Sequence, residues 1–193
     1  MVACLLAAAS LAAPADAPAW KVERADVRVS CPLTVGGSFE AKTRALAGTL
    51  VLAAARPAAF SGELAVDLRT LDTGIALRDR HMRDEYLEVG KGAGFETAVL
   101  SEVRLADADA DTVQGRTGFT ARLALHGEKR TVQGRADIRR QGALARVDAT
   151  FPVKLADFAI ARPQYLGIGV KDEVEVKVSF AATPAAAVSG AAR

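Results

Sequence analysis

Apolar and polar residues alternate with a period of two through most of this chain. Because successive side chains of a β-strand point to opposite faces, such alternation indicates strands with one buried and one exposed face. Eight runs carry the pattern: Val27–Leu33, Leu46–Leu52, Leu64–Leu68, Val99–Leu105, Phe119–Leu125, Val132–Ile138, Val147–Leu155 and Val174–Phe180. In the fourth run we assign Val99, Val103 and Leu105 to the apolar face.

Turn-forming residues separate these runs and keep the connections short. The breaks fall at Gly36-Gly37, Arg56-Pro57, Asp107 to Asp111, Gly115, His126-Gly127, Gln141-Gly142 and Gly167 to Gly169. Two-faced strands with short connections predict an all-β chain with an antiparallel sheet, either closed on itself or folded into two layers. A doubly wound fold is not expected, because strands and helices do not alternate along the chain.

One segment follows a helical period instead. Ile75, Met82, Tyr86 and Val89 fall on one face when residues 75–89 are wound as a helix. The pattern predicts a single helix inserted between strands, with an apolar side that covers part of the sheet and a charged side in water.

The residues around this segment favour a helix as well. Asp72 or Thr73 can cap its start. Asp79 and Arg83 form an acid-first pair four residues apart, and the glycine-rich stretch 91–94 ends the helix.

The N-terminal residues resemble a targeting segment. Residues 5–13 form a short apolar run that is followed by small residues, which is typical of a secretory signal with cleavage between residues 15 and 20. A disordered Ala/Pro-rich tail is the alternative, since no Lys or Arg precedes Leu5. We therefore predict a signal peptide over 1–19, a domain over 20–182, a disordered Ala-rich tail over 183–193, and a periplasmic or secreted protein.

The two cysteines predict no disulfide within the mature chain. Cys4 lies in the predicted signal and leaves with it, so Cys31 is left alone. A single cysteine on the apolar face of a strand is most often a small core residue.

Composition and charge argue against nucleic acid as the partner. The 193 residues include 25 Lys and Arg against 23 Asp and Glu, a formal net charge of +2, and only 5% are aromatic. A groove for single-stranded nucleic acid needs both a basic surface and aromatic residues for stacking. With 50% hydrophobic residues, the chain can instead build a sizeable core.

The sequence offers no catalytic residue and no metal site. Its only histidines are His81 and His126, and no second histidine lies at helical spacing from His81. We expect His81 at a rim or in a structural role and His126 in a turn. The glycines at 90–94 lack the Gly-Lys-Ser/Thr ending of a phosphate loop.

Four segments, in this order, resemble the YceI-like family. They are Trp20 with Gly48–Leu50; Thr70–Gly74 followed by Arg78–Arg83 and Tyr86–Leu87; Leu123–Gly127 followed by Lys129–Arg130 and Val132; and Val170–Asp172 running into Val174–Val178. The resemblance covers about residues 20–182. Two places depart from the family pattern: Val29–Leu33 lacks a histidine, and a glycine-rich stretch precedes Phe95.

The resemblance implies an antiparallel, eight-stranded, lipocalin-like barrel with the helix of residues 75–89 over its opening. It also implies an exported protein that holds a long isoprenoid or quinone-like lipid inside the barrel, with no other cofactor. Transient contact with a membrane or an envelope protein, and a homodimer, are compatible with this role.

The alternating runs predict which residues line the lumen. We assign the larger apolar residues to it, although a register error of one residue would turn a whole strand inside out. The predicted ligand-binding residues are Val66, Leu68, Phe119, Leu123, Phe151, Val153, Val176 and Val178 from the strands, with Met82 and Tyr86 of the helix near one end. Two alternatives stay open: a packed barrel that serves as an interaction or structural module, and a helper that presents lipid to a membrane redox enzyme with His81 contributing.

Overall fold

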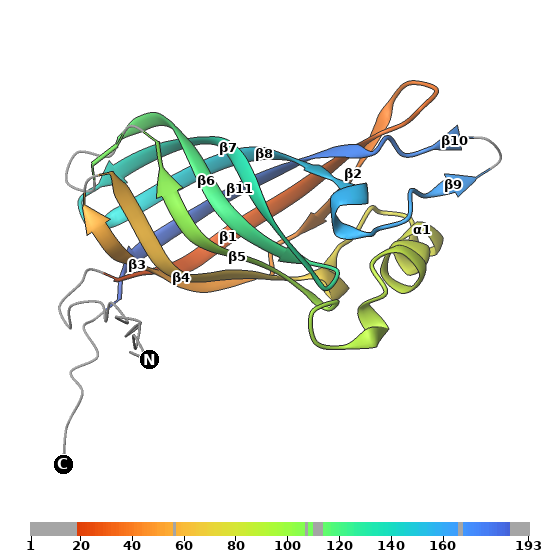
Figure 1. Cartoon of the computed structure of the whole chain (residues 1–193), viewed down its shortest axis with the longest axis horizontal. Coiled ribbons are helices and arrows are strands. Elements are labelled where there is room, and N and C mark those ends of the chain that lie inside the picture. The colour runs from red at the N-terminus through yellow and green to blue at the C-terminus, as the bar shows by residue number, and fades with distance from the viewer. Residues whose placement is uncertain (1–18, 56, 107, 110–113, 166–167, 186–193) are drawn as a thin grey trace, which may run out of the picture.

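The computed structural model describes residues 19–55, 57–106, 108–109, 114–165 and 168–185. Most of these residues belong to strands that form a closed antiparallel barrel (Figure 1). The strands are β1 (Ala19–Pro32), β2 (Ser38–Thr43), β3 (Leu46–Ala55), β4 (Ala58–Asp67), β5 (Thr97–Leu105), β6 (Gly115–Leu125), β7 (Glu128–Gln141), β8 (Leu144–Lys154), β9 (Gln164–Tyr165), β10 (Ile168–Gly169) and β11 (Glu173–Pro184).

Eight strands close the barrel, which confirms the predicted fold class and leaves aside the two-layer alternative. The sheet runs β11-β8-β7-β6-β5-β4-β3-β1, and β1 pairs with β11 to complete the ring. The β1–β11 register extends from Trp20 opposite Pro184 to Ser30 opposite Glu175. The other edge of β1 is shared, because its first residues pair with β3 and its second half pairs with the short strand β2.

The two ends of the barrel differ (Figure 1). At one end, which we call the helix end, lie α1, β9, β10 and the turn between β1 and β2. At the other, the terminal end, the first and last described residues meet, and the amide of Ala185 donates to the carbonyl oxygen of Ala19 at 2.8 Å. The two longest connections, from β4 to β5 and from β8 through β9 and β10 to β11, both lie at the helix end.

The inserted helix is shorter than predicted. An α-helix, α1 (Ala76–His81), continues into a π-helical turn (Met82–Tyr86), and a separate 3-10 turn follows at Val89–Lys91. The helix ends before Val89 because Glu88 adopts a left-handed backbone conformation with φ of 49°. Further 3-10 turns lie at Leu68–Thr70 and Leu155–Phe158. Within the described parts of the chain, no helix has the length and apolar character needed to cross a membrane.

The start of the helix is fixed by Asp79 rather than by a cap at Asp72 or Thr73. The N-cap residue is Ile75, which makes no side-chain capping bond. Instead the carboxylate of Asp79 accepts from the backbone N and Oγ1 of Thr73, at 2.8 and 2.6 Å. Burial pushes the pKa of Asp79 up, but the hydrogen bonds from Thr73 outweigh it and hold the pKa below its usual value.

The predicted pair of Asp79 and Arg83 takes a different form. Arg83 Nε donates to the backbone oxygen of Asp79 at 3.1 Å, and its Nη1 donates to the backbone oxygen of Arg69 at 2.8 Å. Arg83 thus ties the helix to the 3-10 turn that follows β4, and its charge also helps to lower the pKa of Asp79.

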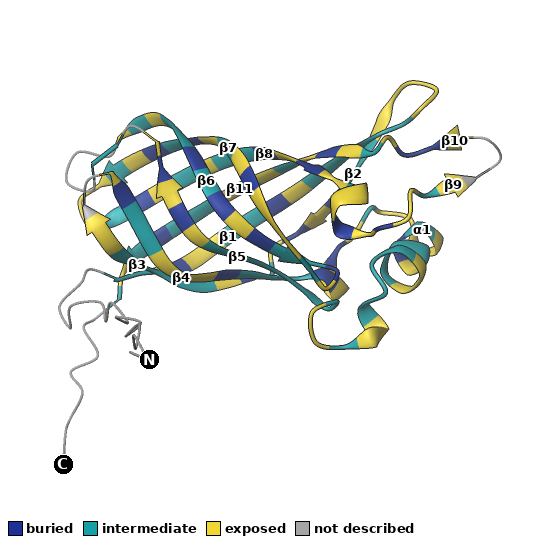
Figure 2. Cartoon of the chain, in the orientation of Figure 1, coloured by how far each residue is buried: buried dark blue, intermediate teal, exposed yellow. Residues whose placement is uncertain are grey.

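Burial alternates along the strands as the period-two pattern requires (Figure 2). One strand departs from the prediction. In β5 the register shifts between Ser101 and Arg104, and Glu102 has a positive φ of 52°, which marks a bulge. Leu100 therefore faces the interior with Val103 and Leu105, and the assignment of Val99 to that face was wrong.

The structure also contains three short strands and a longer last strand that the sequence did not predict. The sequence pattern gave no signal for β2, β9 or β10. Strand β11 continues through Pro184, so Thr183 and Pro184 are paired residues and not part of a disordered tail. The signal-peptide and tail predictions for 1–18 and 186–193, and Cys4 with them, lie outside the described residues.

Candidate ligand cavity

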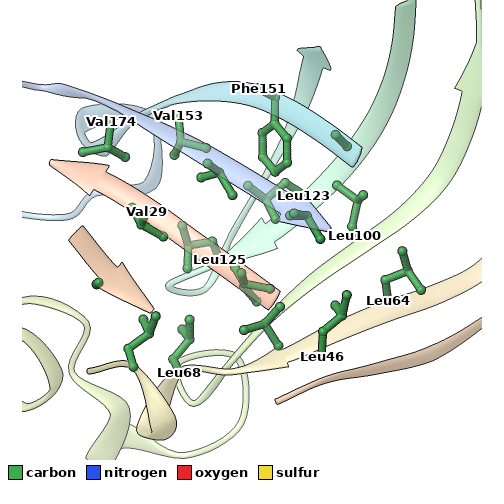
Figure 3. Close-up of a pocket in the computed structure, with 18 of the residues that line it drawn as sticks. Val29, Leu46, Leu64, Leu68, Leu100, Leu123, Leu125, Phe151, Val153 and Val174 are labelled. Atoms are coloured by element: carbon green, nitrogen blue, oxygen red, sulfur yellow. The ribbon is translucent and has the colours of Figure 1, made fainter. Parts of the chain in front are cut away.

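A large apolar cavity runs through the inside of the barrel. Its volume is about 1050 Å³, and inward-facing residues from all eight barrel strands line it. Figure 3 shows some of these residues as sticks. Protein interiors are normally packed to the density of organic crystals, with few voids larger than one water molecule. A space of this size is at the upper end of the range for ligand pockets. The barrel is therefore not the packed module considered as an alternative above.

The structure places all ten predicted ligand-binding residues around this cavity. Seven lie on strands β4, β6, β8 and β11, and Leu68 lies in the 3-10 turn directly after β4. Met82 and Tyr86 come from the π-helical turn at the helix end. Whether these residues bind a lipid stays a prediction.

The prediction missed a larger set of lining residues. These include Val22, Val27, Val29 and Cys31 of β1 and Leu33 just after it, with Leu46, Leu50, Leu64, Leu100, Ile138, Val147 and Val174. Most carry the same alternation as the predicted ones, so the signal was present and only the restriction to a few large residues left them out. Cys31 is the inward-facing residue that its strand position suggested, and burial raises the pKa of its thiol to about 11.

Two aromatic rings meet in the wall of the cavity. Phe119 and Phe151 meet edge to face, with ring centroids 5.9 Å apart and an interplanar angle of 86°. Gly134 on β7 lies behind them: a Cβ atom there would come within 2.7 Å of both Phe119 Cε1 and Phe151 Cβ. The missing side chain of Gly134 therefore makes room for the aromatic pair.

Polar groups line the cavity mainly near its two ends. At the terminal end, Arg140 continues the inward positions of β7, and its guanidinium lies 5.1 Å from the ring centroid of Trp20. At the helix end, the lining includes Arg78, His81 and Glu85 of the helical segment. His81 Nε2 lies 3.8 Å from Glu85 Oε1, so these two groups face each other at the rim.

His126 lies outside the cavity and connects segments at the helix end through its side chain. His126 is the turn residue that the sequence predicted, and it is buried. Its Nδ1 lies 3.0 Å from the backbone oxygen of Phe158, and its Nε2 lies 2.9 Å from Glu88 Oε2. The ring of Phe95 packs edge-on against it at 4.8 Å, and Lys91 pairs with Glu88 at 2.7 Å. We call Glu88, Lys91, Phe95 and His126 the latch.

The Glu88 carboxylate is the charged centre of this latch. A hydrogen bond and ion pair with Lys91, followed by its contact with His126, hold the pKa of Glu88 below its usual range against the opposing effect of desolvation. The latch thereby joins the segment after the helix to the β6–β7 hairpin and to the turn after β8.

The residues that the structure describes include no group of three or more His, Cys, Asp or Glu side chains placed to hold a metal ion. The described part of the chain thus forms an apolar chamber with charged side chains at its two ends.

Comparison with known proteins agrees with this architecture. A sequence model of the YceI-like domain matches residues 20–182 of the chain. The chain belongs to the YceI-like family. The match confirms the resemblance on which the barrel prediction rested.

Solved structures place this YceI-like chain among similar folds. A polyisoprenoid-binding domain from Saccharophagus degradans matches with a TM-score of 0.62 and 17% identity, over 86% of this chain and 98% of the other. BcnA from Burkholderia cenocepacia matches with a TM-score of 0.64 and 17% identity, over 81% and 96%. A YceI protein from Campylobacter jejuni reaches a TM-score of 0.51 at 14% identity, over 66% and 74%. No curated protein matches the sequence.

The opening of this YceI-like barrel carries exposed apolar side chains. Val35, Ile75, Leu77 and Ile168 are the large hydrophobic residues exposed in the described chain, and all four belong to segments at the helix end. Leu77 is 56% exposed and Ile75 is 49% exposed. Ile75, Leu77 and Ile168 also line the cavity, so the exposed set, which we call the apolar rim, is continuous with the lumen.

Proposed function

We propose that this protein holds one long apolar lipid, of isoprenoid or quinone-like type, inside its barrel and performs no chemistry on it. The observation that carries the proposal is the cavity of about 1050 Å³ lined by apolar side chains from every barrel strand. The family assignment and a structural neighbour described as polyisoprenoid-binding support the isoprenoid class.

Burial of the lipid tail supplies the affinity in this proposal. Each methylene transferred from water to an apolar site contributes about 0.8 kcal/mol. A long tail therefore binds tightly without polar contacts along its length, which fits walls built from Val, Leu, Phe and Ala.

In this proposal the lipid enters the lumen through the helix end, because the apolar rim lies there. A lipid has to leave a bilayer before it enters the lumen, and the rim offers apolar contact next to the opening. We propose that a lipid bilayer is the surface that the rim touches, in the periplasm or outside the cell, where the predicted signal peptide would direct the chain.

A substitution that fills the lumen tests the proposal. Val153 is buried in the cavity wall, and Val153→Trp adds volume there without adding charge. We expect a folded protein, at an overpacking cost of about 1–3 kcal/mol, that has lost its long-chain lipid. Mass spectrometry of solvent extracts from purified protein measures the lipid load, and thermal unfolding checks the fold.

The neighbouring residue gives a matched control. Lys154 follows Val153 on β8 and is exposed on the outer face, so Lys154→Trp should keep the wild-type lipid load. Undiminished lipid in folded Val153→Trp would place the ligand outside the lumen. Wild-type protein that carries no lipid from envelope extracts, and takes up no added isoprenoid, would favour a barrel module without a ligand.

A further inference from the structure

Arg78 directs a positive charge into the apolar chamber. It lies on α1 at the helix end and lines the cavity, and its side chain is half-buried. The guanidinium carbon lies 4.4 Å from the ring centroid of Phe39 on β2. Its charge also reaches the interior thiol of Cys31, whose pKa it lowers against the larger effect of burial. The guanidinium is therefore turned inward from the helix.

This guanidinium has no carboxylate partner among the residues that the structure describes. Its contact is the face of the Phe39 ring, whereas Arg28, Arg69, Arg130 and Arg139 on the outside of the barrel each form an ion pair. A charge removed from water is costly unless it is paired. An inward arginine that makes no hydrogen bond to the described residues thus marks a place where a ligand can supply the acceptor.

The other polar lining groups do not compete for this role. Arg140 stacks on Trp20 at the opposite end of the cavity. His81 and Glu85 face each other at the rim, and the Glu85 side chain is 59% exposed, so its negative charge is largely in water. Gln164 is exposed. Arg78 is therefore the cation best placed to meet a group at the mouth of the lumen.

We propose that Arg78 anchors an anionic head group, a phosphate or a carboxylate, of a lipid that enters tail first. This inference rests on the proposed lipid-holding function and adds the class and orientation of the ligand. The tail extends from the helix end toward Phe119 and Phe151, and the head stays at the mouth against the guanidinium. Arginine suits this role because its planar fork of donors matches phosphate and carboxylate oxygens in two parallel hydrogen bonds.

The inference predicts a preference that depends on the head group alone. Farnesyl phosphate and farnesol share one tail and differ in the charged head. We expect the wild-type protein to bind farnesyl phosphate at least tenfold more tightly, since a charge-assisted hydrogen bond is about twice as strong as a neutral one. In Arg78→Met, which keeps an apolar stem over Phe39, the affinity for farnesyl phosphate should fall to that for farnesol, with farnesol affinity unchanged.

Three further measurements complete the test. Arg80→Gln removes an exposed arginine of the same helix and should leave both affinities at wild-type values. Arg78→Lys should keep part of the preference, because it keeps the charge without the fork. Inorganic phosphate alone should not displace farnesyl phosphate; displacement would assign the site to free phosphate and overturn a lipid head group.

The outcomes separate this inference from the proposed function. Equal wild-type affinity for the two probes overturns the anionic head while leaving lipid binding intact. An equal loss of both affinities in Arg78→Met, measured by fluorescence displacement, assigns Arg78 to packing and overturns the anchor. If the wild-type protein binds neither probe nor any longer isoprenoid, the proposed function itself fails.

Discussion

Among single residues, Gly134 leaves the space that the aromatic pair of the cavity wall needs. A Cβ atom at this position would lie 2.5 Å from the backbone oxygen of Thr150 and 2.7 Å from each of the two phenylalanines. The backbone oxygen cannot rotate away as a flexible side chain could, so even one methyl group forces the strands or the aromatic pair to move.

We predict that Gly134→Ala destabilises the protein by about 1–3 kcal/mol, the usual cost of overpacking. Urea unfolding measures the change. Gly118 on the paired strand β6 is the control, because a Cβ there would meet its nearest neighbour, Ala106 Cβ, at 3.4 Å. Gly118→Ala should leave the free energy of unfolding nearly unchanged. An unchanged free energy of unfolding in Gly134→Ala would contradict the prediction, because it would show that the neighbouring residues move aside without cost.

The sequence predicted which apolar strand residues face the lumen, but it did not predict that the charged side chain of Arg78 faces it too. Alternation along β8 and β11 places Phe151, Val153, Val176 and Val178 toward the lumen because the side-chain period of a strand is fixed at two. Arg78 could not be placed in this way. Its inward direction depends on where α1 sits relative to β2, and the helical period alone does not contain that information.

Among the elements, the latch connects the end of the helical segment to the barrel. Glu88 and His126 both adopt left-handed backbone conformations and meet through a side-chain contact of 2.9 Å. Such conformations are unfavourable for residues other than glycine, so the contacts around them have to hold both segments in place. Breaking the latch should therefore loosen the helix end before the barrel.

We predict a pH-dependent contribution from Glu88. Its pKa is lowered from 4.5 in the folded protein, so its stabilising effect is present above about pH 4.5 and is lost as the pH falls through the folded value. The difference in Tm between wild type and Glu88→Gln should be constant above this pH and should shrink as the pH is lowered toward 3.

A second substitution controls this prediction. Lys91 is the main cause of the lowered pKa, so Glu88→Gln should change Tm less in a Lys91→Met background than in the wild type. A Tm difference that stays the same from about pH 6 to pH 3 would contradict a role for the ionised carboxylate.

The elements themselves were predictable where the period is regular. All eight strand runs correspond to barrel strands, but the bulge at Glu102 shifted β5 by one residue, so Leu100 and not Val99 faces the lumen. A bulge depends on pairing with both neighbouring strands, which a single run does not reveal. The helix ended early for a similar reason, because Glu88 is held by contacts with distant segments.

For the whole molecule, the asymmetry between the two ends suggests how the protein is used. The apolar rim and the charged lining groups of the helical segment lie at the helix end. Exposed apolar residues scattered singly need no explanation, but a set gathered around an opening indicates contact with another apolar surface.

We predict that Val35→Asp and Leu77→Asp weaken binding to phosphatidylcholine vesicles by about tenfold or more, because each side chain contributes apolar burial worth about 1.5–3 kcal/mol when fully buried. Both side chains are more than half exposed, at 67% and 56%, so thermal stability should not change. Co-sedimentation with vesicles measures the effect.

The control adds the same charge at the opposite end. Ala143 is exposed in the β7–β8 turn, and Ala143→Asp should bind vesicles as the wild type does. Wild-type vesicle binding in both rim variants would contradict the bilayer contact. A fall in apparent molecular mass in those variants, without any change in vesicle binding, would assign the rim to a homodimer instead.

The hydrogen bond between Ala185 and Ala19 has a practical consequence for handling this molecule. Because the first and last described residues leave the barrel side by side, a linker fused to either one would attach the protein by its base. A sensor chip coated through such a linker would present every opening toward the solution. The same adjacency allows residues 19 and 185 to be joined by a short loop and the chain to be cut elsewhere, which gives circular permutants with the lumen unchanged.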